Sequence, residues 1–128
     1  MSGKKAPRSF DGLQTGLSMP SLMDELTKKI VQFRDARDWK QFHNPKDLAL
    51  ALSIEAAELN EIFLWKSHEA ANKKRLAEEL ADVLICAMLL AHEVDIDIVD
   101  AVSRKLRMNA KKYPVKRSKG IAKKYNEL

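Results

Sequence analysis

The sequence predicts an all-α fold, and its composition supplies the main reasons. Of the 128 residues, 45% are hydrophobic but only 6% are aromatic, and glycine and proline occur four times each. The chain is rich in Ala, Leu, Glu and Lys, which favour helices, whereas sandwiches and barrels use more β-branched, aromatic and turn-forming residues. Its length corresponds to about one domain, so we expect a single core of packed helices.

The cysteine content and the lack of a signal segment bear on the compartment. Cys86 lies in an apolar run and has no second cysteine with which to form an internal disulfide, so we predict that it packs as a small hydrophobic residue. No segment resembles a signal peptide, and no apolar run reaches the roughly 18 residues of a membrane span. We therefore expect a soluble, cytoplasmic protein with no membrane partner.

The first helix is expected after a flexible leader. Residues 1–19 show no sustained periodicity and contain three of the four glycines, so we place them outside the core. Ser21 with Asp24 three positions later is typical of a helix N-terminus. Apolar residues then recur at helical spacing to about residue 37, at Leu22, Leu26, Ile30 and Phe33.

Two long helices are expected next, joined by a short connection. Asn44 supplies an N-cap and Pro45 a first helical residue, and we predict a helix from Pro45 to about Trp65. The six residues KSHEAA form the connection, and a third helix runs to about Glu93. So short a connection makes these two helices antiparallel neighbours.

A fourth helix and a basic extension complete the chain. An aspartate cap is followed by apolar residues at helical spacing, and Pro114 ends this helix. Residues 115–128 are charged and interrupted by a glycine, so we predict an extension that orders on contact. Residues 104–128 carry ten Lys or Arg against one acid. Such a basic end can attract nucleic acid, an anionic membrane or a phosphorylated small molecule.

Four acidic side chains border the core-facing surface of the central helix pair. Glu55 and Glu58 are three residues apart on the second helix, and Glu79 and Asp82 are three apart on the third. Each pair therefore shares a helix face, with Cβ atoms ~5–6 Å apart. The apolar stripes beside them are Leu48, Leu52, Leu59 and Ile62 on one helix and Leu76, Leu80, Val83 and Leu90 on the other.

The antiparallel register brings the four carboxylates together. A turn centred in the middle of the connection sets Glu58 level with Glu79 and Glu55 level with Asp82, and helix axes ~8–10 Å apart allow them to converge. Grouped anions repel unless protons or a cation compensate. Ligands that are all oxygen suit Mg²⁺, with Mn²⁺ as a substitute. We therefore predict a four-helix-type bundle with an antiparallel metal-binding helix pair.

The acidic phrases also allow two other interpretations. A single ExxE phrase is usually a solvated helix face, so the prediction depends on two such phrases in matching register. A di-iron bundle would need Glu-x-x-His pairs, and neither phrase has a histidine three residues on. A divalent cation held by oxygen atoms alone is the better match.

At these residues the sequence resembles the all-α nucleoside triphosphate pyrophosphohydrolases, the MazG-like superfamily, whose metal signature is ExxE, a spacer and ExxD. Within it the likeness is greatest to the dCTP pyrophosphatase branch. The likeness runs from about Phe33 to Pro114 through FRDARDWKQFHNPKDLALALSIEAAELNEIFLW, EELADVL and RKLRMNAKKYP. It implies a helical catalytic domain over residues 20–114 and a dimer as the active unit, often paired into a tetramer.

The resemblance also implies site residues. The catalytic metal ligands would be Glu55, Glu58, Glu79 and Asp82. The substrate-binding residues would be Trp39, Phe42, His43 and Trp65 around the nucleotide, and Lys105, Asn109, Lys112 and Tyr113 around the phosphates. Two positions depart from the pattern and bear on base preference: Ile30 stands where relatives carry histidine, and Cys86 where they carry tyrosine.

The implied reaction is Mg²⁺-dependent hydrolysis of a (deoxy)nucleoside triphosphate, with dCTP or 5-modified dCTP favoured, to the monophosphate and pyrophosphate. Such chemistry needs phosphate charge neutralised, a water held in line and the leaving pyrophosphate stabilised. Trp39 and Trp65 could stack on a base, an interaction of ~1–3 kcal/mol per base in nucleic-acid binders, although a tryptophan more often belongs to a core. A house-cleaning role in nucleotide metabolism would follow.

A second interpretation is a helical nucleic-acid-binding module. It would use the basic residues 104–124, and the acidic residues would form a cation-stabilised core. Binding of this kind would depend steeply on salt. Aromatic residues are sparse in this segment, which argues against base recognition, so we favour the enzyme and expect no nucleic-acid partner.

Overall fold

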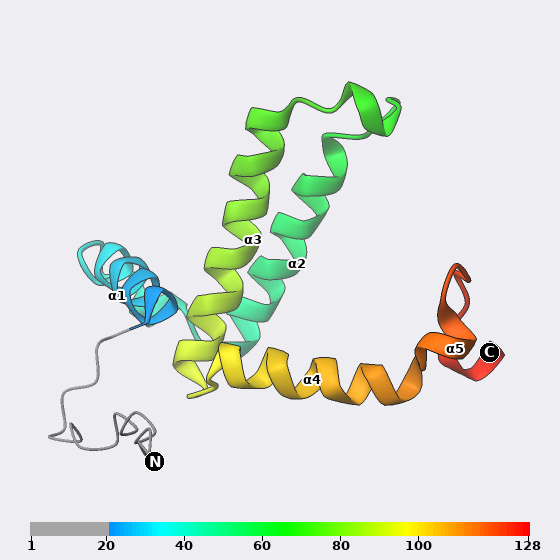
Figure 1. Cartoon of the computed structure of the whole chain (residues 1–128). Helices are drawn as coiled ribbons and strands as arrows, with labels where there is room; N and C mark the ends of the chain where they lie inside the picture. Colours follow the sequence, from blue (N-terminus) through cyan, green and yellow to red (C-terminus); the bar gives the residue numbers. More distant parts are fainter. Residues whose placement is uncertain (1–20) are drawn as a thin grey trace, which may run out of the picture.

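The structure is a computed structural model that describes residues 21–128, and these residues form helices joined by turns and loops (Figure 1). The predicted leader lies outside the described residues. Among the described helices, none has both the length and the apolar composition that crossing a bilayer requires. The all-α prediction is confirmed. The helices are α1 (Leu22–Asp35), η1 (Lys40–Phe42), α2 (Pro45–Glu61), η2 (His68–Ala70), α3 (Lys73–Glu93), α4 (Ile98–Lys112), α5 (Val115–Ser118) and η3 (Tyr125–Glu127).

The helices begin where the sequence places capping residues. Ser21 and Asp24 form a capping box, in which each side chain accepts a hydrogen bond from the other's backbone N–H at 3.1 Å. Asn44 caps α2 and Asp97 caps α4, each accepting at 2.9 Å from the N–H three residues on. A cap of this kind contributes about 1 kcal/mol. These contacts are local in sequence, which is why the helix starts could be predicted.

The central unit of the fold is the pair α2 and α3. The two helices lie side by side and run in opposite directions, connected by the loop that contains η2 (Figure 1). Leu48 and Ile62 from the α2 segment are 2% exposed, and Met88, Leu89 and Ala91 of α3 are also buried. The first two belong to the predicted apolar stripe and the last three to the apolar end of the third helix. The predicted antiparallel pair is therefore confirmed.

Arg34 joins α1 to the end of α3. Its side chain is buried, and its guanidinium donates at 2.6 Å to Glu93 and at 2.9 Å to Asp35. Its backbone carbonyl accepts from the N–H of Arg37 at 3.1 Å and of Trp39 at 3.2 Å. Arg34 therefore fixes both the packing of α1 on α3 and the path of the loop that carries Trp39.

Substituting Arg34 should destabilise the protein strongly. Arg34→Met would leave the partly buried carboxylate of Glu93 without its partner, and breaking a buried ion pair on one side costs about 3 kcal/mol. The matched control is Arg104→Met, which removes an exposed ion pair with Asp100 on α4 and should cost less than ~1 kcal/mol. Urea unfolding at one protein concentration measures both. Equal midpoints for the two variants would contradict the structural role of Arg34.

Helix α4 leaves the central pair at the end of α3 and runs away from it (Figure 1). Within the described residues, the helices that pack extensively are α2 with α3 and α1 with α3. Large apolar side chains on α4 consequently remain exposed, namely Val99, Val102, Leu106 and Met108. A row of exposed apolar residues on a helix indicates a surface that another molecule covers. The bundle is therefore not closed by α4 within one chain.

Residues 115–128 fold back at the far end of α4, and we call this segment the C-terminal hook. It consists of α5, a turn and η3. Gly120 in the turn has a φ of 73°, a left-handed conformation that favours glycine. The guanidinium of Arg117 donates to the carbonyl oxygen of Leu128, which ties the start of the hook to its end.

Candidate metal centre and aromatic pocket

Three carboxylates from the central helix pair converge, and we call them the acidic cluster. Glu55 and Glu58 of α2 and Glu79 of α3 each offer an oxygen, and these oxygens lie within 4.8 Å of one another. Glu55 and Glu79 are partly buried, and each has a buried carboxylate oxygen without a hydrogen-bond partner in the described part of the chain. A buried polar atom left unpaired is destabilising. The cluster therefore has the form of a site that a cation would complete.

The electrostatics of the acidic cluster agree with this interpretation. Burial raises the pKa of Glu55 above its ordinary value, and the neighbouring charges of Glu58, Asp82 and Glu79 raise it further. A divalent cation would relieve both effects, because it supplies the opposite charge and accepts the unpaired oxygens as ligands. Donors that are all carboxylate oxygens fit a hard cation such as Mg²⁺ or Mn²⁺.

Asp82, the fourth predicted ligand, lies beside the acidic cluster and is not part of its 4.8 Å group. Its charge nevertheless acts on Glu55, and the two residues line the same pocket. An aspartate side chain is one methylene shorter than a glutamate, which accounts for its shorter reach from α3. Three of the four predicted carboxylates are thus brought together, and the fourth stands at their edge.

A hollow of ≈ 520 Å³ opens beside Glu55 and Asp82, and its aromatic wall leads us to call it the aromatic pocket. The ring of Trp39 meets Phe33 with centroids 5.9 Å apart and His43 at 6.5 Å, both edge-on. Phe33 is held in turn by the guanidinium of Arg37, 3.6 Å from its ring centre. Nδ1 of His43 is buried and has no hydrogen-bond partner among the described residues. The pocket thus combines ring faces, one unpaired imidazole nitrogen and two carboxylates.

Several lining residues were not predicted as site residues. Phe33 was expected only as an apolar residue of the first helix, and Arg34 was not expected to be buried. Ile30 and Cys86, the two positions that the sequence analysis connected with base preference, both line the pocket. Ile30 lies one helical turn before Phe33, and Cys86 lies one helical turn after Asp82. This spacing is the sequence signal that could have identified them as lining residues. The full lining is Lys29, Ile30, Phe33, Arg34, Trp39, His43, Ala51, Glu55, Asp82, Ile85, Cys86 and Leu89.

A second hollow, of ≈ 500 Å³, lies where the starts of α1 and α4 meet the end of α3. Asp24 and Asp97 line it, but both take part in helix caps. Asp24 accepts a hydrogen bond from the N–H of Ser21, and Asp97 accepts one from the N–H of Asp100. One carboxylate oxygen of each aspartate therefore already accepts a hydrogen bond, and neither aspartate has a buried unpaired oxygen like those of Glu55 and Glu79. For this reason we assign the functional site to the aromatic pocket.

Six of the predicted substrate-binding residues do not reach the aromatic pocket of their own chain. Trp65 is 94% exposed and has a φ of 60°, a left-handed conformation that costs a tryptophan about 1 kcal/mol or more. Helix α2 ends at Glu61, four residues before the predicted end at Trp65, so Trp65 lies beyond the helix. Phe42 is exposed, and the other four lie on or just after α4: Lys105, Asn109, Lys112 and Tyr113.

Fold and site together define an all-helical protein with a carboxylate cluster suited to a divalent cation and an aromatic pocket beside it. Residues 50–128 match the model of the MazG-like family. A dCTP pyrophosphatase 1 from Rattus norvegicus is 39% identical over 114 residues, which cover 83% of this chain and 67% of that protein. The human dCTP pyrophosphatase 1 is 35% identical over the same shares of the two chains.

A solved structure supports the same assignment. The crystal structure of a pyrophosphatase from Archaeoglobus fulgidus aligns with a TM-score of 0.70 and 40% sequence identity, covering 77% of this chain and 97% of that chain. The chain belongs to the MazG-like family. The resemblance inferred from the acidic phrases is thereby confirmed.

Proposed function

We propose that this protein, a nucleotide pyrophosphohydrolase of the MazG-like family, uses Mg²⁺ to hydrolyse dCTP or 5-modified dCTP to the monophosphate and pyrophosphate. The observation that carries the proposal is the acidic cluster, with buried unpaired oxygens, at the edge of an aromatic pocket. Two relatives at 35% and 39% identity bear the name dCTP pyrophosphatase, which supports the choice of substrate.

The carboxylates would hold the metal and orient the reacting groups. Glu55, Glu58 and Glu79 would bind it directly, and Asp82, whose charge acts on Glu55, would be the fourth carboxylate beside them. When bound, Mg²⁺ supplies positive charge that stabilises the phosphate oxygens in the transition state and lowers the pKa of a bound water. The helices on which the carboxylates stand are fixed by the core at Leu48 and Met88. The donor oxygens are therefore positioned before substrate arrives, which favours catalysis.

The aromatic pocket would hold the base. Trp39 offers a ring face for stacking, and Nδ1 of His43 is available to hydrogen bond to a polar edge of the base. Ile30 and Cys86 also line the pocket and add apolar surface to its wall. Such a wall suits a pyrimidine with an apolar 5-substituent better than one with a polar 5-substituent.

A second copy of the chain would complete the site, so we propose a homodimer, with a homotetramer as its further association. The basic end of α4 lies away from helices α2 and α3 of its own chain (Figure 1). Lys105, Asn109 and Lys112 can meet a triphosphate only if they serve the site of another copy. The exposed apolar residues of α4 and the exposed Trp65 would be covered by the same association.

A panel of nucleotides tests this function. Incubation with each deoxynucleoside and ribonucleoside triphosphate and Mg²⁺ should release pyrophosphate and monophosphate, fastest with dCTP or 5-methyl-dCTP, because the pocket selects a pyrimidine. Separation of the products by ion-exchange chromatography measures this. Chelation of the metal should stop the reaction. Release of orthophosphate and diphosphate in place of pyrophosphate would refute the reaction class.

A further inference from the structure

The C-terminal hook contacts α4 at the residues assigned to the phosphates. The ammonium of Lys112 lies 5.0 Å from the ring centre of Tyr125, and the ring of Tyr113 meets the same ring edge-on at a centroid distance of 6.2 Å. One side chain of the hook thus touches both Lys112 and Tyr113. The proposed reaction assigns no role to Tyr125.

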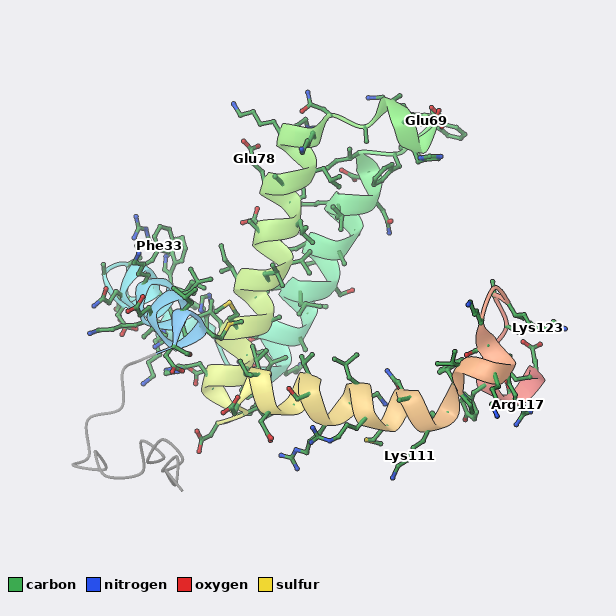
Figure 2. All side chains as sticks on the ribbon, viewed as in Figure 1. Phe33, Glu69, Glu78, Lys111, Arg117 and Lys123 are labelled. Atoms are coloured by element: carbon green, nitrogen blue, oxygen red, sulfur yellow. The ribbon has the colours of Figure 1, made fainter. Side chains whose placement is uncertain are left out.

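A network of local contacts holds Tyr125 in this place. Arg117 donates to the carbonyl oxygen of Leu128, and Figure 2 shows Arg117 on the hook beyond the end of α4. The hydroxyl of Ser118 donates to the carbonyl of Pro114 at 2.7 Å, and the carbonyl of Tyr113, the C-cap of α4, lies 3.2 Å from the same hydroxyl oxygen. These contacts hold the start of the hook against the end of α4.

The geometry leaves Lys112 able to bind an anion. A cation over a ring is attracted by the ring electrons, but the ring carries no net charge and leaves the charge of the ammonium uncompensated. None of the ion pairs formed in the described residues involves Lys112. Tyr113 and Tyr125 are 37% and 46% exposed, so solvent and ligands can reach this side of the hook. The ring of Tyr125 therefore restrains the direction of the Lys112 side chain, while its charge has no acidic partner among the described residues.

We propose that the C-terminal hook is a positioning element of the active site, in which the ring of Tyr125 holds Lys112 and Tyr113 in place to receive the substrate phosphates. The inference deepens the proposed function and rests on it, since Lys112 acts on phosphate only if the protein hydrolyses nucleotides. A free lysine has four rotatable carbon–carbon bonds, and ordering it before binding removes part of the entropy lost when phosphate binds. Tyr125 is thus a positioning residue and not a catalytic one.

Two substitutions at Tyr125 distinguish the effect of the aromatic ring from the effect of side-chain size. Tyr125→Phe keeps the ring and should retain the KM and kcat of the unchanged protein within about twofold, whereas Tyr125→Leu keeps an apolar side chain without a ring. Tyr125→Leu should raise KM for the triphosphate about three- to fivefold, in line with a cation–π contact at an exposed site. The value of kcat should change less than twofold, because the lost contact acts on binding.

Lys112 is the group through which Tyr125 acts, so a double-mutant cycle completes the test. Lys112→Met should raise KM, and adding Tyr125→Leu to it should raise KM no further. Lys111→Met is the matched control on the neighbouring position and should leave KM unchanged; Figure 2 shows Lys111 on the outer side of α4. Arg117→Gln, which releases the end of the hook, should raise KM in the same direction as Tyr125→Leu.

The outcomes distinguish this inference from the function on which it rests. If the unchanged protein releases no pyrophosphate from any triphosphate, the proposed function fails and the inference falls with it. If the unchanged protein is active but Tyr125→Leu and Tyr125→Phe share its KM, the inference alone is wrong. Additive effects of Tyr125→Leu and Lys112→Met would overturn it as well. Circular dichroism melting curves show whether each variant folds, and Arg117→Gln remains as an independent test.

Discussion

Glu79→Gln is expected to lower kcat/KM for the triphosphate by roughly 100-fold or more while the helical content stays unchanged. Glu79 is the contribution of α3 to the acidic cluster, and its carboxylate is partly buried with one unpaired oxygen. The amide that replaces it has nearly the same size but no charge, so the metal would be held less tightly. Glu58→Gln and Asp82→Asn should act in the same direction. Steady-state rates with varied Mg²⁺ measure the loss.

The adjacent residue provides the matched control for this prediction. Glu78 is exposed and points away from α2, as Figure 2 shows, so Glu78→Gln should leave activity unchanged. Mg²⁺ should raise the melting temperature of the unchanged protein and of Glu78→Gln, but not that of Glu79→Gln, since a ligand stabilises only a state that binds it. Without metal, Glu79→Gln should be at least as stable as the unchanged protein, because one of the repelling charges is gone. Full activity of Glu79→Gln would show that the metal centre is misassigned.

Mixing two inactive chains should restore activity, which is the second large effect expected. Glu79→Gln removes a proposed metal ligand, and Lys105→Met removes a basic group on α4, the helix that runs away from the central pair. If each site joins the acidic cluster of one copy to α4 of the other, a mixed dimer has one intact site. Equal co-expression should then give about a quarter of the unmodified activity, as random pairing of a symmetric dimer predicts. Either variant alone should remain inactive.

A chain that carries both substitutions gives the decisive comparison. Co-expressed in equal amounts with the unmodified chain, it should leave about a quarter of the activity, because only dimers of two unmodified chains have intact sites. Sites contained within one chain would instead leave about a half. They would also give no recovery when the two single variants are mixed. Measuring pyrophosphate release from the purified mixtures distinguishes the two arrangements.

The helices and the acidic cluster could be predicted from the sequence because they depend on contacts between near neighbours. Ser21, Asn44 and Asp97 cap their helices through residues three positions away. The register of α2 and α3 follows from counting outward from the turn between them, although α2 ends at Glu61 and the connection is longer than the predicted six residues. Glu55, Glu58 and Glu79 meet as that counting predicts.

The tertiary structure alone decided the features that depend on distant contacts. Arg34 is buried because Glu93, far along the chain, ends α3 beside it. Trp65 is exposed and α4 runs away from the central pair because, among residues 21–128, neither packs extensively against another helix. The hook folds back because Tyr125 packs on Tyr113 across a glycine turn. Helical periodicity and capping determine where helices form and which face is apolar, but which surfaces then meet depends on the packing of the whole chain.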